Sequence, residues 1–130
     1  MYIKKVMMAE DDEEDIDLFK NVLADLEVEV NLQVAVNGVE LMKMLEESVV
    51  YPELVFLDLN MPFKNGMLCL QEIKANPKWK NVKVIILSTS SQQDQIKAAY
   101  DKGADFYMVK LSNYVDFKNA VASCLQKTWQ

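Results

Sequence analysis

Histidine is absent from this chain of 130 residues, and cysteine occurs only twice, at Cys69 and Cys124. The two cysteines are far apart, and neither belongs to a Cys-x-x-Cys pair. Because protein zinc sites are built mainly from histidine and cysteine, a zinc site is excluded. Both cysteines fall in apolar patterns of helical spacing, so we expect buried, reduced thiols.

Glycine and proline are scarce, with three of each, and no apolar run approaches the roughly 18 residues of a membrane-spanning helix. The chain is 51% hydrophobic and 26% charged, with a mean hydropathy of -0.06. This composition excludes membrane-spanning, collagen-like and disordered proteins, and the length fits one domain. The first residues lack the features of a secretory signal, so we expect a cytoplasmic protein without a membrane partner.

The net charge of -6 originates in one short segment. Seven acidic side chains fall within residues 10–17, and the rest of the chain carries a net charge of +1. A local acidic cluster indicates a cation site or the start of a helix. Since no basic stripe occurs, binding to DNA or RNA is not expected.

Short apolar runs alternate with segments of helical periodicity five times along the chain. The runs predict strands over 6–9, 28–36, 54–57, 82–87 and 106–109. The helical patterns run from about Asp12 to Leu26, from Gly38 to Val49, from Gly66 to Asn76, through Ile96 and Tyr100 to Gly103, and from Tyr114 to Leu125. Regular alternation predicts an α/β fold with a parallel sheet and helices on both faces.

The second predicted strand alternates apolar and polar residues, which is typical of a strand at the edge of a sheet. Five strands with this edge strand favour the order 2-1-3-4-5, the flavodoxin-like three-layer sandwich. In such sheets, ligands bind beyond the carboxyl ends of the strands, where the strand order reverses.

Each predicted central strand ends in polar residues at that edge. Glu10 and Asp11 follow the first strand, Asp58 the third, Ser88 and Thr89 the fourth, and Lys110 the fifth. Two carboxylates about 5 Å apart repel by roughly 3 kcal/mol at an effective dielectric of about 20, so the cluster favours a bound cation. Oxygen ligands without histidine or thiolate select Mg²⁺, or else Mn²⁺ or Ca²⁺, over zinc or copper.

With a divalent cation in place, the predicted chemistry is phosphoryl transfer onto Asp58. Carboxylates are established nucleophiles for phosphoryl groups, and Asp58 needs no general base because it is already ionised at neutral pH. Lys110 and the Ser88 hydroxyl would bind the phosphoryl oxygens.

These motifs together resemble those of response-regulator receiver domains. They are the acid pair Glu10-Asp11, the segment Asp-Leu-Asn-Met-Pro from Asp58 to Pro62 followed by Gly66, Ser88, and Gly-Ala-Asp-Phe-Tyr-Met-Val-Lys from Gly103 to Lys110. The resemblance covers nearly the whole chain, and it implies one receiver domain over residues 1–130 without an output domain.

The resemblance also implies a role for each motif residue. Asp58 would receive a phosphoryl group from a phosphohistidine on a sensor histidine kinase or histidine phosphotransfer protein, and an unidentified downstream protein would bind the switched surface. Mg²⁺ would be held by Glu10, Asp11, Asp58 and the backbone carbonyl of Asn60. Ser88 would be the switch hydroxyl, Tyr107 the switch aromatic and Lys110 the phosphate-binding cation. Such a domain is a signalling phosphoacceptor rather than an enzyme, with at most slow self-phosphorylation and self-dephosphorylation.

The chain departs from the family pattern at two positions. Leu111 stands where receivers usually have a proline after the lysine, which puts the geometry of that loop in question and makes a cis peptide costly. Thr89 stands where the family often has a smaller residue, and we expect its bulk to slow the attack of water on a phosphoryl group. Asp12, a more variable position, is predicted to cap the first helix.

Plainer structural roles remain open for several of these residues. Glu13, Glu14, Asp15 and Asp17 fit a solvated helix start, and Tyr107 fits ordinary packing in a strand. Alternative functions are a receiver-like binding module that works without phosphorylation and a Mg²⁺-dependent phosphatase with an aspartate nucleophile. The phosphatase family requires Asp-x-Asp after the first strand, which this chain lacks. A flavodoxin-like cofactor binder is disfavoured because the acids after the first strand would repel the phosphate of a flavin.

Overall fold

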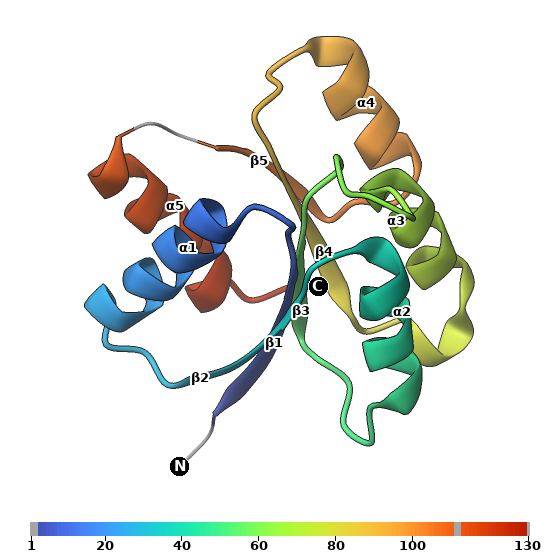
Figure 1. Ribbon diagram of the computed structural model, residues 1–130, viewed down its shortest axis with the longest axis horizontal. Coiled ribbons are helices and arrows are strands. Elements are labelled where there is room, and N and C mark those ends of the chain that lie inside the picture. Colours follow the sequence, from blue (N-terminus) through green and yellow to red (C-terminus); the bar gives the residue numbers. More distant parts are fainter. Residues whose placement is uncertain (1–2, 111–112, 130) are drawn as a thin grey trace.

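The computed structural model describes residues 3–110 and 113–129, in which strands and helices alternate (Figure 1). The strands are β1 (Lys4–Ala9), β2 (Val30–Ala35), β3 (Leu54–Leu57), β4 (Lys83–Ser88) and β5 (Phe106–Val109). The helices are α1 (Glu13–Asp25), α2 (Gly38–Glu47), α3 (Gly66–Ala75), α4 (Gln93–Asp101) and α5 (Tyr114–Gln126), with a short 3-10 helix η1 (Pro77–Trp79).

The five strands form one parallel sheet in the order β2-β1-β3-β4-β5, which confirms the predicted α/β fold. β2 lies at the edge, and its residues alternate between exposed and half-buried before Ala35. The alternation that identified the edge strand therefore reflects one face that contacts the core and one that contacts water.

Helices cover both faces of the sheet, with α1 and α5 on one side and α2, α3 and α4 on the other (Figure 1). Successive strand residues point to opposite faces, so Met7, Val55 and Ile86 pack under α2, α3 and α4. Met8 and Phe56 pack under α1 and α5. This two-sided burial explains why the central strands are continuous apolar runs.

The start of α1 is fixed by its predicted cap. The Asp12 Oδ1 atom accepts hydrogen bonds from the backbone N–H groups of Glu14 at 2.9 Å and Asp15 at 3.2 Å, which confirms the prediction. Asn37, Asn65 and Asn113 cap α2, α3 and α5 in the same way. Each helix that follows a strand at the carboxyl edge therefore has a defined first turn, except α4, which lacks a side-chain cap bond.

Some predicted positions were wrong. Val49 was assigned to the second helix, but α2 ends at Glu47 and Val49 is 98% exposed in the following loop. Val28 and Val36 lie outside β2, and Tyr100 is partly exposed although it belongs to the apolar pattern of α4. The errors fall at element ends, where apolar periodicity gives the weakest signal.

Cys69 and Cys124 are both buried and free, as predicted. Burial raises the pKa of each thiol to about 11. Within the described residues, every helix falls short of the length and apolarity that crossing a membrane would demand.

Candidate functional site at the carboxyl edge of the sheet

Backbone hydrogen bonds continue the sheet by one residue beyond the strands and thereby align the acidic residues. The Glu10 N–H donates to the Ala35 carbonyl at 2.9 Å, and the Asp58 N–H donates to the Ala9 carbonyl at 3.0 Å. Glu10 and Asp58 thus leave neighbouring strands at the same edge, as the predicted topology required.

Three carboxylates meet there. One oxygen each from Glu10, Asp11 and Asp58 lies within 4.8 Å of the others. Glu10 and Asp58 are buried, whereas Asp11 is exposed. The structure therefore gathers the predicted acids into one oxygen-rich cluster that is open to solvent on the Asp11 side.

The cluster is strained electrostatically. Burial, together with the neighbouring Asp58 carboxylate, raises the pKa of Glu10 to about 7 despite the lowering effect of Lys110. Because the Asp58 carboxylate disfavours the charged form of Glu10, a cation would relieve the repulsion.

The loop after β3 holds Asp58 in place. Asn60 donates its backbone N–H to Asp58 Oδ1 at 3.3 Å. Gly66, at the start of α3, donates to the Leu59 carbonyl at 3.0 Å, and a Cβ atom at Gly66 would lie 2.1 Å from the Asp58 carbonyl oxygen. Glycine is needed at this position because α3 starts in direct contact with the Asp58 backbone.

Lys110 brings a positive charge to the cluster from the end of β5. Its N–H donates to the Ser88 carbonyl at 2.7 Å, and its ammonium donates to Glu10 Oε1 and Asp15 Oδ2, both at 2.7 Å. Burial lowers the pKa of Lys110, but the bonds to Asp15 and Glu10 outweigh it, so the pKa lies above its ordinary value. Lys110 therefore stays charged at neutral pH.

The contact with Asp15 was not predicted, because that residue was assigned to a solvated helix start. Asp15 lies three residues before Leu18 and seven before Val22, both of which pack on the core beneath α1. That helical spacing turns Asp15 toward the sheet and was the available signal. No pattern in the sequence indicates that the partner of Asp15 is Lys110, which lies 95 residues away along the chain.

Ser88 and Tyr107 both form hydrogen bonds with Ser90, in the loop between β4 and α4. The Ser88 hydroxyl is buried and accepts the Ser90 N–H at 3.1 Å. The Tyr107 ring is also buried, and its hydroxyl donates to the Ser90 carbonyl at 2.8 Å. Thr89, between the two serines, is exposed. Leu111, the departure from the family pattern, lies outside the described residues.

A model of the response regulator receiver domain matches residues 6–122 of the chain. The chain is a response regulator receiver domain. This finding confirms the resemblance drawn from the four motifs.

Curated relatives agree with this family. The receiver domain is 33% identical to the response regulator Rcp1 of Synechocystis over 118 residues, which cover 87% of this chain and 80% of Rcp1. It is 38% identical to the chemotaxis protein CheY of Listeria monocytogenes over 93 residues, which cover 72% of this chain and 74% of that protein.

Solved structures agree as well. The phosphorylated cyanobacterial phytochrome response regulator RcpA superimposes with a TM-score of 0.86 and 33% identity, covering 95% of this chain and 91% of that one. The Mn²⁺-bound form of Rcp1 superimposes with a TM-score of 0.86 and 30% identity, covering 98% and 97%.

Proposed function

We propose that this receiver domain works as a stand-alone, cytoplasmic response regulator that carries a phosphoryl group on Asp58. Its donor is the phosphohistidine of a sensor histidine kinase or histidine phosphotransfer protein. The observation that carries the proposal is the cluster of Glu10, Asp11 and Asp58, with the Lys110 ammonium 2.7 Å from Glu10. The phosphorylated state of the similar RcpA supports it.

In the proposed step, a carboxylate oxygen of Asp58 attacks the phosphorus atom and forms an O–P bond. The P–N bond to the donor imidazole breaks, and the imidazole keeps the electron pair and takes a proton. The partly exposed cluster lets the donor reach Asp58, which is 6% exposed. Loss of the phosphoryl group to water would later return Asp58 to its starting state.

The residues of the cluster fit a divalent cation. Their donors are carboxylate oxygens that lie within 4.8 Å of one another, and oxygen is the ligand atom that Mg²⁺ and Mn²⁺ prefer. Glu10, Asp11, Asp58 and the Asn60 backbone carbonyl would hold Mg²⁺, and the Mn²⁺-bound form of Rcp1 supports Mn²⁺ as a substitute. When bound, the cation would supply positive charge that offsets the phosphoryl oxygens.

Two further groups would bind the phosphoryl oxygens. Lys110 would exchange one of its carboxylate partners for a phosphoryl oxygen, and the Ser88 hydroxyl would turn toward the same group and give up its bond from Ser90. Both changes pull on the end of β4 and the loop that follows it.

Tyr107 would transmit the movement of the loop after β4 to the protein surface. Its hydroxyl already bonds the Ser90 carbonyl, two residues beyond Ser88, so movement of Ser88 acts on the same loop. The switched surface would consist of α4, β5 and α5, where a downstream protein binds. A shift from 1:99 to 99:1 between the two surfaces requires about 5.5 kcal/mol of differential interaction.

Incubation with acetyl phosphate and Mg²⁺, followed by intact-mass measurement, tests the proposal. We expect an adduct of about 80 Da, one phosphoryl group, that is stable in acid and labile in base. Asp58→Asn removes the nucleophile and should abolish the adduct, while Asp17→Asn, a matched change on α1, should leave it intact. If the wild type forms no adduct with any donor, the remaining interpretation is a binding module that works without phosphorylation. Sustained turnover of a phosphomonoester would instead indicate a phosphatase.

A further inference from the structure

Four exposed apolar side chains gather beside the phosphorylation site. Val36 follows β2, Val39 lies in the first turn of α2, Phe63 lies in the loop after β3, and Leu68 lies in the first turn of α3. Their exposed fractions are 47%, 55%, 88% and 49%. We call these four residues the apolar lip.

The elements that carry the apolar lip lie side by side. A Cβ atom at Gly38 would lie 2.2 Å from the Lys64 carbonyl oxygen and 2.8 Å from Cys69 Sγ. Val39, Phe63 and Leu68 are the sequence neighbours of these three contacting residues. The start of α2, the loop after β3 and the start of α3 are therefore in direct contact with one another.

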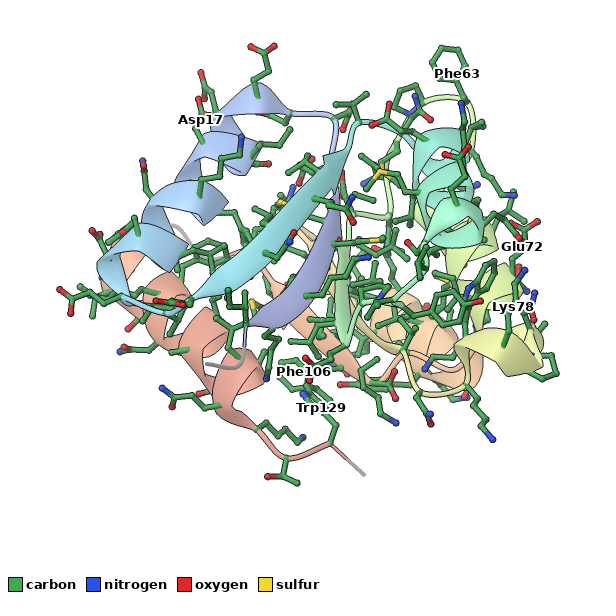
Figure 2. The ribbon with its side chains drawn as sticks, turned by 90° about the horizontal axis from the view of Figure 1, so that it is seen from below. Asp17, Phe63, Glu72, Lys78, Phe106 and Trp129 are labelled. Carbon is green, nitrogen blue, oxygen red and sulfur yellow. The ribbon has the colours of Figure 1, made fainter. Side chains whose placement is uncertain are left out.

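Phe63 is the most prominent member of the lip. Figure 2 shows its ring projecting outward, at the opposite end of the molecule from Trp129. Its backbone has a φ of 68°, a left-handed conformation that a bulky side chain rarely adopts. The fold thus holds a large aromatic ring in water, five residues after Asp58, without burying it.

The opposite side of the site is acidic. Asp11, Glu13, Glu14 and Asp17 are exposed at the start of α1, which covers the other face of the sheet from α2 and α3 (Figure 1). Asp58 lies between this acidic surface and the apolar lip. Because a phosphohistidine must bring its phosphorus atom to Asp58, a donor protein has to approach the edge of the sheet that lies between these two surfaces.

We propose that the apolar lip is the docking contact for the phosphohistidine donor, which presents apolar side chains on one side of its phosphohistidine and Lys or Arg on the other. This inference rests on the proposed function and adds the partner's recognition chemistry. Desolvation of the Phe63 ring would give affinity, and the acidic surface would orient the donor. A small donor such as acetyl phosphate needs neither surface.

The test compares a protein donor with a small donor on the same variants. Phe63→Asn combined with Leu68→Gln removes the centre of the lip, since asparagine tolerates the left-handed backbone and glutamine suits a helix. Val49→Gln combined with Val50→Gln is the matched control, because these exposed valines lie in the loop before β3, at the other end of the sheet. The protein donors are ATP-phosphorylated catalytic portions of the histidine kinases, and the phosphorylated phosphotransfer proteins, from the genome that encodes this chain.

For the donor that phosphorylates the wild type fastest, the lip variant should lose about tenfold or more in kcat/KM, mainly through KM. Its rate with acetyl phosphate and its circular dichroism should match the wild type, and the control variant should match it with both donors. Equal transfer to the lip variant and the wild type would overturn the inference while leaving the proposed function intact. If no protein donor transfers a phosphoryl group to the wild type and acetyl phosphate forms no adduct with it, the proposed function itself is overturned. If the wild type sediments as a dimer, the lip variant sediments as a monomer and the transfer rate is unchanged, the apolar lip instead binds a second copy of the chain.

Discussion

Asp15, in the first turn of α1, accepts a hydrogen bond of 2.7 Å from the Lys110 ammonium, which also donates to Glu10. Two of the three N–H donors of Lys110 are therefore engaged by carboxylates. Since a phosphoryl oxygen on Asp58 would compete for the same ammonium, Asp15 would oppose the approach of Lys110 to that group.

Asp15→Asn should increase the rate of phosphorylation by acetyl phosphate about two- to fivefold, as expected for loss of one partly exposed ion pair. The charge that competes for Lys110 is removed, while the side chain keeps its shape. The rate is measured by intact mass at a fixed Mg²⁺ concentration. Asp17→Asn makes the same change in net charge on the exposed side of α1. An equal increase in both variants would show that net charge, rather than the Asp15 contact, sets the rate.

Cation binding should depend on pH through Glu10. Burial raises the pKa of this carboxyl to about 7, and Mg²⁺ binds the ionised form, so affinity should rise with pH until Glu10 is deprotonated. Between pH 6 and pH 8 the ionised fraction rises about tenfold, and calorimetric titration should show a similar gain in affinity. Glu10→Gln should bind Mg²⁺ weakly and lose this pH dependence. Equal wild-type affinity at both pH values would contradict the prediction.

Gly66→Ala should disturb both the fold and the site. The new methyl group would lie 2.1 Å from the Asp58 carbonyl oxygen, so α3 and the loop after β3 must separate. Overpacking of this kind costs about 1–3 kcal/mol, measurable as a lower free energy of unfolding in urea. Phosphorylation should also slow, because Asp58 moves with its backbone. Gln71→Ala, at an exposed position on α3, should change neither quantity.

Thr89→Ala should increase the rate of autodephosphorylation. Thr89 is exposed beside Ser88, at the edge where water must approach a phosphoryl group on Asp58. Replacing it removes a hydroxyl and a methyl group and opens that approach. The rate is followed by the decay of the phosphorylated mass after the donor is removed, and an unchanged rate would refute the hypothesis. Ser91→Ala, in the same loop, is the control.

The element types and their order were predictable because each has a strong local signature. The strand from Leu54 to Leu57 is continuously apolar since helices cover both of its faces, and Asp12 marks the start of α1 through its own side-chain hydrogen bonds. The end of α2 was missed because apolar spacing continues to Val49, although Val49 contacts water.

The sequence by itself determined that polar residues end the central strands and that parallel strands bring those ends to one edge, so Glu10, Asp11, Asp58, Ser88 and Lys110 could be assigned to a common site. Only the tertiary structure decided how Lys110 divides its hydrogen bonds, that α3 starts against the Asp58 backbone, and that the start of α2 contacts the loop after β3 and the start of α3. These features depend on distances between atoms far apart along the chain. Such distances arise when the helices pack on the sheet, whereas strand and helix periodicity depends on near neighbours.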